Sequence, residues 1–392
     1  MASTAEAPYN QGGNPPLINH GGPVMSTPDV GSQVVLTPIY WAPSGYTFTE
    51  SYKSVINTYI ANLAADSGKT TNVFGSLPQY SGSNGTIGAK FVVGTPLDDA
   101  APFPSSGGCT PDSGSIYADN SGYTACVDDA QLTAETGNVL AANGLTSDLG
   151  HMYLVFLPQG VESCFGPDGS TNQACTINYT ASSAYCAYHS AFGPGGSSIY
   201  AAMPFPVYYS GTNQSCSSEG TQLGQQSPNG DVGADVELSP LSHEVAEAIT
   251  DPHGDTWYDS AGYENGDDCS YIYGTAQGTP GAMWNQTING AHYLTQEEFS
   301  NADFVPGQAG CVQQLTLLPT ITSVSPGYGS QSGGQAVTIT GTGFSTASTV
   351  RFGSSPATGT TVVSPTQITA RTPAAAAGSV DITVTTSAGT SP

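Results

Sequence analysis

The sequence predicts two successive domains: an α/β or α+β domain over residues 31–315 and an all-β sandwich over residues 319–392. Strand-like and helix-like runs alternate in the first part, which is typical of a sheet covered by helices. All eight cysteines also lie in this part. The last part has no cysteine and consists of short alternating runs between Gly, Pro and Ser turns, which is typical of a sandwich.

The first predicted strand is residues 33–41 (QVVLTPIYW), a β-branched and aromatic run that we expect to be buried and broken at Pro38. A helix should follow, because Thr47 with Glu50 three residues later forms a capping-box pattern, and the helix should stop at Ser67 and Gly68. Between these ends, apolar residues recur at helical spacing: Tyr52, Ile56, Tyr59, Ile60 and Leu63.

Later elements are expected to complete a central sheet. A second helix is predicted around residues 128–142, and residues 152–157 (MYLVFL) form the most strand-like run of the chain. Residues 199–209 (IYAAMPFPVYY) predict another strand, whose prolines favour the edge of the sheet. Residues 1–30, rich in Gly, Pro and Asn, are predicted to form an extended lead-in.

The charge balance is strongly acidic. Five Lys and Arg residues face thirty Asp and Glu residues, for a net charge of -25. Such a surface repels nucleic acid, so we exclude nucleic-acid binding. The shortage of cationic partners favours an acidic environment, because protonation of carboxylates there reduces self-repulsion. No apolar run approaches the roughly 18 residues of a membrane span, so we expect none.

The cysteines predict disulfides. Their number is even and none forms a CxxC motif, which favours an oxidising compartment and a secreted, extracellular protein. Pairing between sequence neighbours closes modest Gly/Ser-rich loops. The expected bridges are Cys109 with Cys126, Cys164 with Cys175, Cys186 with Cys216, and Cys269 with Cys311.

The tail has a recognisable sequence. Two stretches within residues 319–392 resemble the IPT/TIG family of immunoglobulin-like domains. They are PTITSVSPGYGSQSGGQAVTITGTGFS and VRFG. The resemblance implies an immunoglobulin-like sandwich that acts in bacterial extracellular proteins as a spacer or as an adhesion and carbohydrate-contact unit. The simpler interpretation here is a structural spacer.

Residues 236–269 hold the densest group of candidate ligands. Ser239 is a typical N-cap, Pro240 suits the first helical position and Pro252 stops the helix, so we predict a helix of about three turns. One arc of roughly 120° carries the polar residues. These are His243, Glu244, Glu247, Thr250 and Asp251, whereas Leu241, Val245, Ala248 and Ile249 lie on the opposite, packing side.

This spacing predicts a metal site. His243 and Glu247, at i and i+4, can bind one divalent ion from the same side of a helix. Glu244 is placed to polarise a metal-bound water, as in HExxH metallopeptidases. Here Glu247 replaces the second histidine; Zn²⁺ accepts an oxygen ligand, but the added negative charge makes the bound water less acidic.

Three residues are candidates for a third ligand: Glu264, Asp251 and Asp267. We favour Glu264, because Asp251 beside the helix-ending Pro252 is equally suited to capping the turn. Asp251 remains the second choice.

Three other interpretations stay open. A helix face with His and carboxylates is commonly just hydrated surface. A carboxylate pair for glycoside hydrolysis, Asp231 or Asp235 with Glu237, depends on a separation that only three dimensions give. A more weakly supported Ca²⁺ site, which does not match an EF-hand loop, would use Asp255, Asp259, Glu264, Asp267 and Asp268.

Residues 243–252 (HEVAEAITDP), 257–259 (WYD) and 264–269 (ENGDDC) resemble the EXORDIUM or phosphate-induced-protein family and its bacterial relatives. Residues 21–24 (GGPV) and 38–41 (PIYW) fit as well, and so does FSN at residues 299–301, where the family pattern leads us to expect Trp in place of Phe299. The resemblance spans most of residues 20–314. It implies an extracellular or cell-wall protein linked to growth and carbon status.

The HExxE core is also similar to the zincin metallopeptidase helix, which implies a zincin-like N-terminal domain. By that similarity His243 and Glu247 would bind the metal and Glu244 would be the general base. Tyr258 or His253 would assist at the oxyanion.

Two functions follow. The first is a secreted zinc-dependent peptidase in which His243, Glu247 and Glu264 hold Zn²⁺ and Glu244 activates water. The second is a non-catalytic extracellular binding protein, associated with the cell wall or with polysaccharide, whose ion is structural and whose IPT/TIG tail attaches it to a surface. The expected partners are therefore extracellular protein or polysaccharide.

Overall fold

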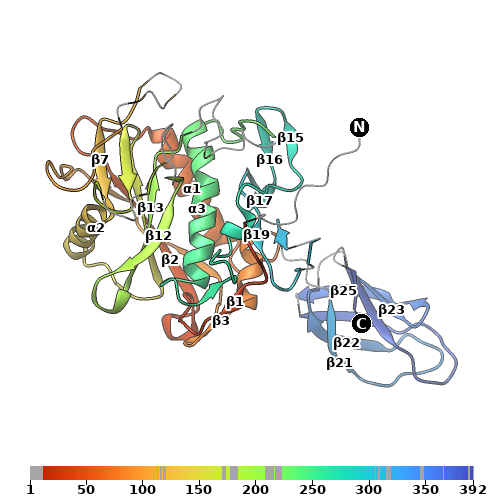
Figure 1. Cartoon of the computed structure of the whole chain (residues 1–392). Helices are drawn as coiled ribbons and strands as arrows, with labels where there is room; N and C mark the ends of the chain where they lie inside the picture. The colour runs from red at the N-terminus through yellow and green to blue at the C-terminus, as the bar shows by residue number, and fades with distance from the viewer. Residues whose placement is uncertain are drawn as a thin grey trace. The chain divides into compact units, whose positions relative to one another are not determined.

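The computed structural model describes residues 12–112, 114, 117, 121–169, 174–176, 184–207, 216, 223–304, 306–307, 310–314, 319–344, 348–364, 366–386 and 389–391. The chain forms two compact units, Met1–Leu315 and Thr316–Pro392 (Figure 1). Each is described by itself. Among the described residues, no helix has both the length and the apolar character needed to cross a membrane.

The N-terminal unit is built on a six-stranded sheet with the order β12-β13-β8-β2-β5, in which β6 also pairs with β2. All of its pairings are parallel except that of the edge strand β12 with β13, which is antiparallel. The strands are β2 (Gln33–Trp41), β5 (Lys90–Val93), β6 (Leu97–Asp99), β8 (His151–Leu157), β12 (Tyr188–Phe192) and β13 (Ser198–Pro204).

Two expectations about proline were wrong. Strand β2 is not broken at Pro38: residues 33–36 pair with β5 and residues 39–41 with β6, so Pro38 lies where one neighbour gives way to the other. Strand β13 is not at the edge but lies between β12 and β8. Its only proline, Pro204, is its last residue, so the missing N–H does not interrupt the hydrogen bonds between the strands.

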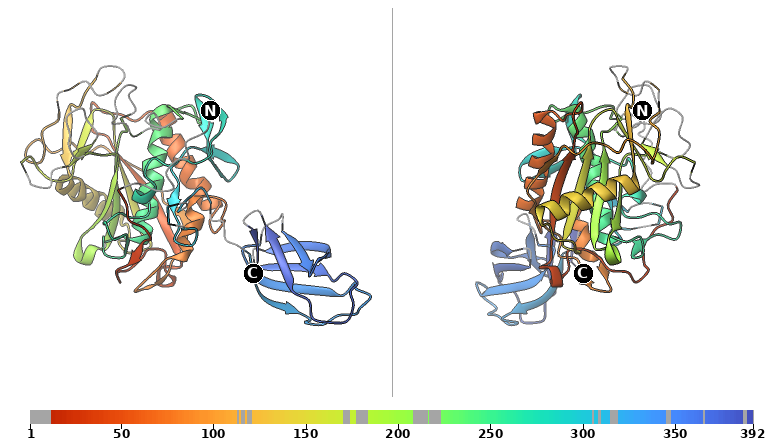
Figure 2. Two further views of the ribbon diagram at one scale, coloured as in Figure 1. Left: turned by 45° about the vertical axis from the view of Figure 1, so that its right-hand side comes forward. Right: turned by 90° about the vertical axis from the view of Figure 1, so that its left-hand side faces the viewer.

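Three helices cover the two faces of this sheet: α1 (Glu50–Ala65), α2 (Asp129–Asn143) and α3 (Val232–Thr250). Side chains alternate along β8, so Met152, Leu154 and Phe156 join the core under α1 and α3. Tyr153, Val155 and Leu157 join the core under α2. Figure 2 shows α2 on the opposite side of the sheet from the other two helices, so the unit has three layers.

Capping decides where the first two helices begin. Helix α2 has the capping box of Asp128 with Gln131, and the predicted helix around residues 128–142 is confirmed. Helix α1 begins later than the Thr47 pattern indicated, because Thr49 is its N-cap and accepts the N–H of Tyr52 at 3.1 Å. It ends at Ala65, just before the expected stop.

Helix α3 differs most from its prediction. It begins after the N-cap Asp231, whose Oδ1 accepts the N–H of Ala234 at 3.0 Å, so Pro240 lies inside the helix rather than at its start. Ser239 is therefore not an N-cap; its hydroxyl accepts the N–H of Gln296 at 3.0 Å. All residues of α3 except Val232 and His243 are buried. This packing outweighs the preference of proline for a helix start.

The predicted lead-in is partly structured. Residues 1–11 lie outside the described part. Beyond them, β1 (Ile18–Asn19) pairs with β14 (Trp257–Tyr258), and the N–H of Met25 donates to the carbonyl of Ile249 at 3.0 Å. Met25 is fully buried. This segment is thus part of the core beside the end of α3.

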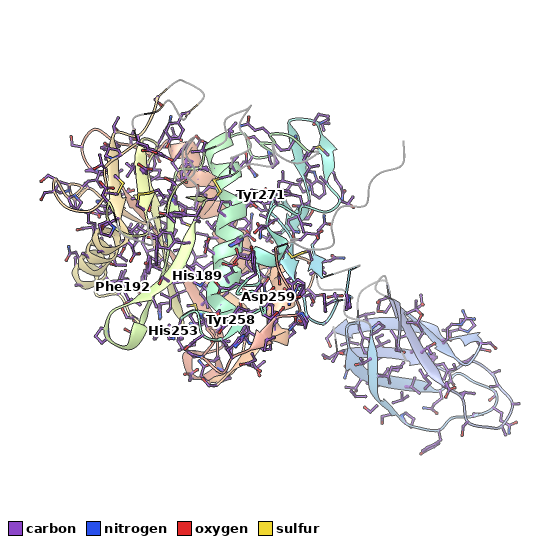
Figure 3. All side chains as sticks on the ribbon, in the orientation of Figure 1. His189, Phe192, His253, Tyr258, Asp259 and Tyr271 are labelled. Atoms are coloured by element: carbon purple, nitrogen blue, oxygen red, sulfur yellow. A yellow bond between two sulfur atoms is a disulfide. The ribbon has the colours of Figure 1, made fainter. Side chains whose placement is uncertain are left out.

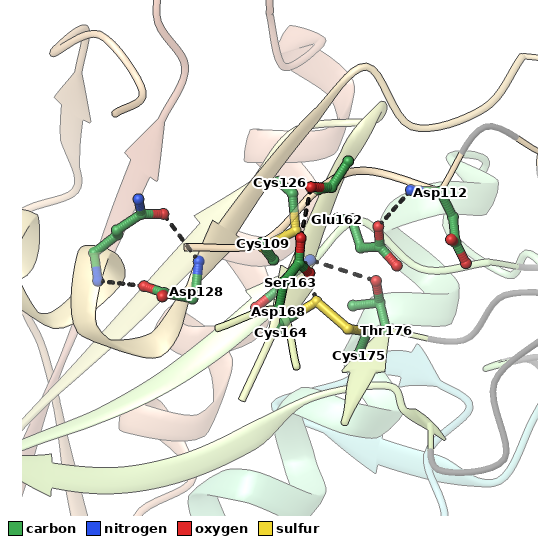
Figure 4. The surroundings of a disulfide bond; sticks show 12 residues. Cys109, Asp112, Cys126, Asp128, Glu162, Ser163, Cys164, Asp168, Cys175 and Thr176 are labelled. Carbon is green, nitrogen blue, oxygen red and sulfur yellow. Dashed lines mark hydrogen bonds between the residues drawn. A yellow bond between two sulfur atoms is a disulfide. The ribbon is translucent and has the colours of Figure 1, made fainter. Parts of the chain in front are cut away.

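All four predicted disulfides are confirmed: Cys109–Cys126, Cys164–Cys175, Cys186–Cys216 and Cys269–Cys311. The first two involve strands of a second sheet, which has the order β11-β10-β9-β7 (Figure 4). In this sheet Glu162 accepts the N–H of Asp112 at 2.8 Å. The strands of this sheet are β7 (Ala125–Asp128), β9 (Val161–Cys164), β10 (Cys175–Thr176) and β11 (Ala184–Tyr185).

Short elements complete the N-terminal unit after α3 and around the core. The two-stranded pieces are β3 (Ser81–Gly82) with β4 (Gly85–Thr86), β15 (Gln277–Thr279) with β16 (Ala282–Trp284), β17 (Gln286–Ile288) with β18 (Ala291–Tyr293), and β19 (Glu298–Phe299) with β20 (Cys311–Val312). The 3-10 helices are η1 (Pro28–Val30), η2 (Val73–Gln79), η3 (Pro194–Gly196) and η5 (Asp267–Cys269).

The C-terminal unit consists of two four-stranded antiparallel sheets around a core that includes Ile339, Phe352, Ile368 and Val384. One sheet has the order β21-β22-β26-β25 and the other β24-β23-β27-β28. The strands are β21 (Thr320–Ser325), β22 (Ala336–Thr342), β23 (Thr349–Phe352), β24 (Ser355–Pro356), β25 (Thr358–Ser364), β26 (Gln367–Arg371), β27 (Ile382–Thr386) and β28 (Gly389–Thr390).

Buried Glu237 of α3 allows a test of this packing. Burial raises the pKa of Glu237 well above its ordinary value, and Tyr52 of α1 lies beside it and opposes the rise. A carboxyl whose pKa is raised on folding loses stability as pH rises above its unfolded pKa of about 4.3, by up to about 1.4 kcal/mol per pH unit. We therefore expect Glu237→Gln to unfold at a higher temperature than the native protein at pH 8, and with a smaller difference at pH 5.

Thermal unfolding followed by circular dichroism at both pH values measures this effect. Glu50→Gln, at an exposed carboxylate, is the control and should change neither unfolding temperature much. A Glu237→Gln variant that is equally destabilised at both pH values would show that ionisation of this carboxyl does not destabilise the fold.

Candidate metal centre

Three segments bring titratable side chains together beside the sheet. Helix α3 carries His243, Glu244 and Glu247, while His189 comes from the edge strand β12. The turn that leads into η5 contributes Glu264, and η5 itself contributes Asp267. Figure 3 shows His189 beside α3. We call these six residues the carboxylate–histidine cluster.

The first half of the cluster gathers around His243. Its Nε2 lies 3.0 Å from Glu247 Oε1, 3.8 Å from Asp267 Oδ1 and 3.9 Å from Glu244 Oε1. One donor atom from each of His243, Glu247 and Asp267 lies within 4.8 Å of the others. The backbone N–H of Asp267 also donates to Glu247 Oε1 at 2.9 Å, which fixes η5 against the helix.

The second half gathers around His189. Its Nδ1 lies 3.2 Å from Glu244 Oε2 and 3.7 Å from Glu247 Oε2. Its Nε2 lies 3.1 Å from the carbonyl oxygen of Asp251 and 3.7 Å from Glu264 Oε1. A carbonyl oxygen only accepts, so the hydrogen bond to Asp251 places a proton on Nε2. The ring therefore turns Nδ1 toward the two glutamates of α3.

The other nitrogen of His243 has its own partner. Gln296 Nε2 lies 3.0 Å from His243 Nδ1 and donates to the carbonyl of Gly266 at 2.8 Å. In this arrangement the amide nitrogen donates to Nδ1, and Nε2 carries the proton that faces Glu247. A metal on Nε2 requires the proton on Nδ1, and hence the amide oxygen of Gln296 toward the ring.

The electrostatics of the cluster are dominated by buried negative charge. Burial opposes protonation of His189, yet the carboxylates of Glu264, Glu244 and Glu247 together raise its pKa to about 10. Burial raises the pKa of Glu247 to about 7, with repulsion from Asp267 and Glu244 adding to the effect and His243 opposing it. Burial likewise raises the pKa of Glu264 well above its ordinary value. The site therefore has a strong affinity for positive charge.

Several buried oxygens here lack a hydrogen bond in the described part of the structure. They are Glu264 Oε1, Asp251 Oδ2 and both carboxylate oxygens of Glu298, whose pKa burial raises well above its ordinary value. Imidazole nitrogen with carboxylate oxygen is a donor set that zinc accepts. Orphaned carboxylates beside two imidazoles thus fit a divalent cation.

The interpretation of the helix face as hydrated surface is wrong. Glu244 and Glu247 are each 3% exposed. A buried carboxylate requires a compensating charge or hydrogen bonds, whereas a solvated one does not.

The structure separates the three candidates for a third ligand. Asp267, which the sequence did not favour, is the one beside His243 Nε2. Glu264 contacts His189 instead. Asp251 caps the turn after α3, because its Oδ1 accepts the N–H groups of Asp255 at 2.7 Å and Thr256 at 2.8 Å.

Tyr258 and His253 do not take the positions expected of oxyanion donors. Tyr258 lies in β14 and stacks on His20 with the ring centroids 3.6 Å apart. The exposed His253 has its Nε2 3.0 Å from the carbonyl oxygen of Gly196. Both are labelled in Figure 3. None of their described contacts joins them to His243.

The other acidic residues proposed for Ca²⁺ are placed differently. Asp259 Oδ1 accepts the N–H groups of Ala261 at 2.7 Å and Tyr263 at 2.9 Å, so it organises its own turn. Asp268 is buried. The Asp235 side chain accepts hydrogen bonds from Ser227 and Asn229, and Asp231 caps the start of α3.

A pocket of about 220 Å³ opens beside the cluster. His243, Glu244 and Asp267 lie in its wall together with Gln296. The rest of the wall includes three tyrosines and one disulfide. They are Tyr185, Tyr271, Tyr273 and Cys186–Cys216. A substrate in this pocket would therefore lie against His243 and Glu244.

Sequence reasoning missed His189 and Gln296. His189 lies in a strand far from the HExxE motif, and no local spacing connects the two segments. A histidine at an inward position of a strand in a chain with only six histidines is the one signal that was available.

Comparison with known proteins matches this architecture. Residues 121–302 match the family described as the phosphate-induced protein 1 conserved region, and residues 319–392 match the IPT/TIG domain. The match to the phosphate-induced protein 1 conserved region lies within the N-terminal unit. That region contains the whole carboxylate–histidine cluster, and both family resemblances predicted from the sequence are confirmed.

One relative is Protein EXORDIUM-like 3 of Arabidopsis thaliana. It is 43% identical over 68 residues, which cover 16% of this chain and 20% of that protein. The match thus spans a fifth of the length of the relative.

His189 allows a test of the charge balance in the metal-free protein. Because its pKa is raised on folding to about 10, the stability that it contributes is complete below its ordinary pKa of 6.5 and is lost as pH rises through about 10. Removing one partner of a buried ion pair costs on the order of 3–5 kcal/mol. We expect His189→Gln to lower the unfolding free energy by about that amount near pH 6.5, and by less at pH 10.

Urea unfolding after dialysis against a chelator gives both values. His253→Gln, at an exposed histidine, is the matched control and should be near neutral at both pH values. A loss for His189→Gln that does not shrink toward pH 10 would contradict a charged, buried imidazolium.

Proposed function

We propose that the N-terminal unit is a secreted, zinc-dependent hydrolase that cleaves peptide bonds. One observation carries the proposal: His243, Glu247 and Asp267 converge on one point with Glu244 next to it, and His243, Glu244 and Asp267 line an open pocket. This is the relation between ligands and base that the HExxE sequence pattern predicts, with Asp267 in place of Glu264.

The chemistry divides between the ion and the protein. When bound, zinc supplies Lewis-acid activation of a water molecule and of the substrate carbonyl. Glu244 Oε1 lies 3.9 Å from His243 Nε2 and can accept the proton of the attacking water. As the new C–O bond forms and the C–N bond breaks, Glu244 can pass this proton to the leaving amine.

The edge strand β12 supports a peptide as substrate. It pairs with β13 on one side, and in the described part of the chain its other edge has no backbone partner. An extended peptide can add to such an edge through main-chain hydrogen bonds. His189 of β12 contacts Glu244, so a peptide added there would pass the cluster. An antiparallel edge strand beside the HExxE helix also supports a zincin-like arrangement.

The compartment follows from the same structure. Four disulfides are stable in an oxidising environment, and the strongly acidic composition fits an extracellular one. The proposal therefore places the protein outside the cell that makes it.

A second candidate function is non-catalytic binding of a cell-wall polymer or polysaccharide. Tyr271 is 46% exposed and lines the pocket with Tyr185 and Tyr273, and aromatic faces of this kind can stack on sugar rings. In this function the ion would be structural, and the IPT/TIG unit would attach the protein to its polymer.

Metal analysis combined with casein hydrolysis tests the first function. We expect purified protein to contain zinc and to hydrolyse casein, and Glu244→Gln to retain zinc while losing activity by about 10²–10⁴-fold, the usual contribution of a general base. Glu50→Gln, on the exposed start of α1, should behave as the native protein does.

The alternative makes a different prediction for the same samples. The binding function is favoured if His243→Gln loses zinc and the native protein hydrolyses no casein between pH 4 and 9. Co-sedimentation with insoluble polysaccharide, weakened by Tyr271→Ala, would then support it directly.

A further inference from the structure

We propose that a second divalent cation binds between His189, Glu244 and Glu247, so that the carboxylate–histidine cluster holds a binuclear metal centre. The inference rests on the proposed function for the first ion, at His243, Glu247 and Asp267. It adds a ligand from β12, a segment that the HExxE motif does not include.

Both glutamates of α3 face both imidazoles. Glu247 directs Oε1 to His243 at 3.0 Å and Oε2 to His189 at 3.7 Å. Glu244 directs Oε1 to His243 at 3.9 Å and Oε2 to His189 at 3.2 Å. Each carboxylate therefore divides its two oxygens between the two imidazoles. Glu247 can therefore bridge two ions about 3.5–4 Å apart, the separation in two-metal hydrolytic sites, while Glu244 gives only Oε2 to the second ion.

The spacing of the donors fits an ion in each half. One donor atom from each of His189, Glu244 and Glu247 lies within 4.8 Å of the others, as in the group around His243. Ligands at about 2.0–2.2 Å from one ion lie within about 4.4 Å of each other. Small side-chain movements are therefore enough to close either group on an ion.

His189 is in the tautomer that metal binding needs. Its Nε2–H donates to the carbonyl of Asp251, so in the neutral ring the lone pair is on Nδ1, which faces the glutamates. Metal-bound histidines commonly donate their other ring N–H to a backbone carbonyl in this way. The capped turn after α3 thus orients the ligand.

The charge of the cluster also calls for a second cation. Four carboxylates, those of Glu244, Glu247, Glu264 and Asp267, surround two imidazoles, and one Zn²⁺ balances only two of them. The lysines of the unit are elsewhere: Lys53 pairs with Asp98, Lys69 pairs with Asp66, and Lys90 is exposed in β5. Arg351 and Arg371 contact Ser354 and Gly334 in the C-terminal unit. A second ion is the remaining way to neutralise this site without protons.

A second ion changes the role of Glu244 only in part. With Oε2 on the second ion, Oε1 remains directed to the side of His243 and can still take a proton from water. Glu264 Oε1 lies 3.7 Å from His189 Nε2, on the side of the ring away from Glu244.

Metal stoichiometry of the full chain is the decisive test. The protein is stripped with a chelator, loaded with Mn²⁺, desalted and measured by elemental analysis and electron paramagnetic resonance. We expect two ions per native chain, with the spectrum of a spin-coupled pair. His189→Gln should bind one ion and show the six-line spectrum of isolated Mn²⁺. His253→Gln, outside the cluster, should bind two.

The outcomes separate the two proposals. One uncoupled ion in the native protein, unchanged in His189→Gln, would overturn the second site and leave the proposed centre at His243. Two ions that persist in His189→Gln would also overturn it, because the second would then lie elsewhere. No ion in the native protein would overturn the proposed function itself. The native measurements do not depend on a variant, so they remain decisive if His189→Gln fails to fold.

Discussion

Burial of acidic side chains on α3 is the constraint on which the site depends. The helix lies against strands β12 and β13 of the sheet, α1 and η2, and all but two of its residues are buried. It nevertheless carries Asp235, Glu237, Glu244 and Glu247. A buried carboxylate either takes up a proton, as the raised pKa of Glu237 indicates, or needs a compensating group beside it. Histidines from α3 and β12, and a hydrogen-bonding turn at η5, take that part around Glu244 and Glu247.

The topology explains how these groups reach one place. Strand β12 turns back antiparallel to β13 and so brings His189 along the edge of the sheet next to α3. The disulfide Cys269–Cys311 anchors η5 to β20, which holds Asp267 against the helix. Gln296, just before β19, closes the other side by contacting both His243 and the turn. Segments from four parts of the chain thus meet around the carboxylate–histidine cluster.

Local patterns in the sequence were sufficient for much of the fold. Strong periodicity predicted α1 and the strand at residues 152–157, the capping residue Asp128 stands where α2 begins, and neighbouring cysteines predicted all four bridges. The HExxE spacing also placed His243, Glu244 and Glu247 on one side of a helix, as the structure shows.

The failures have physical causes of a different kind. Pro240 was expected to start a helix and Thr47 to cap one, but tertiary packing extended α3 and Thr49 offered the better cap. The choice between Glu264 and Asp267 depended on how a turn folds back on the helix, which no residue spacing encodes. His189 could not be assigned because its partners are more than fifty positions away in the chain.

The disulfide in the pocket wall has a consequence for when the site exists. Cys186 Sγ lies 3.4 Å from the hydroxyl of Tyr271, and the bridge to Cys216 ties this side of the pocket to a distant segment. In a reducing cytoplasm that bond does not form. A chain in which this bond is reduced would therefore lose the covalent tie between Cys186 and Cys216 in the pocket wall, so the shape of the cavity depends on the redox state of its surroundings.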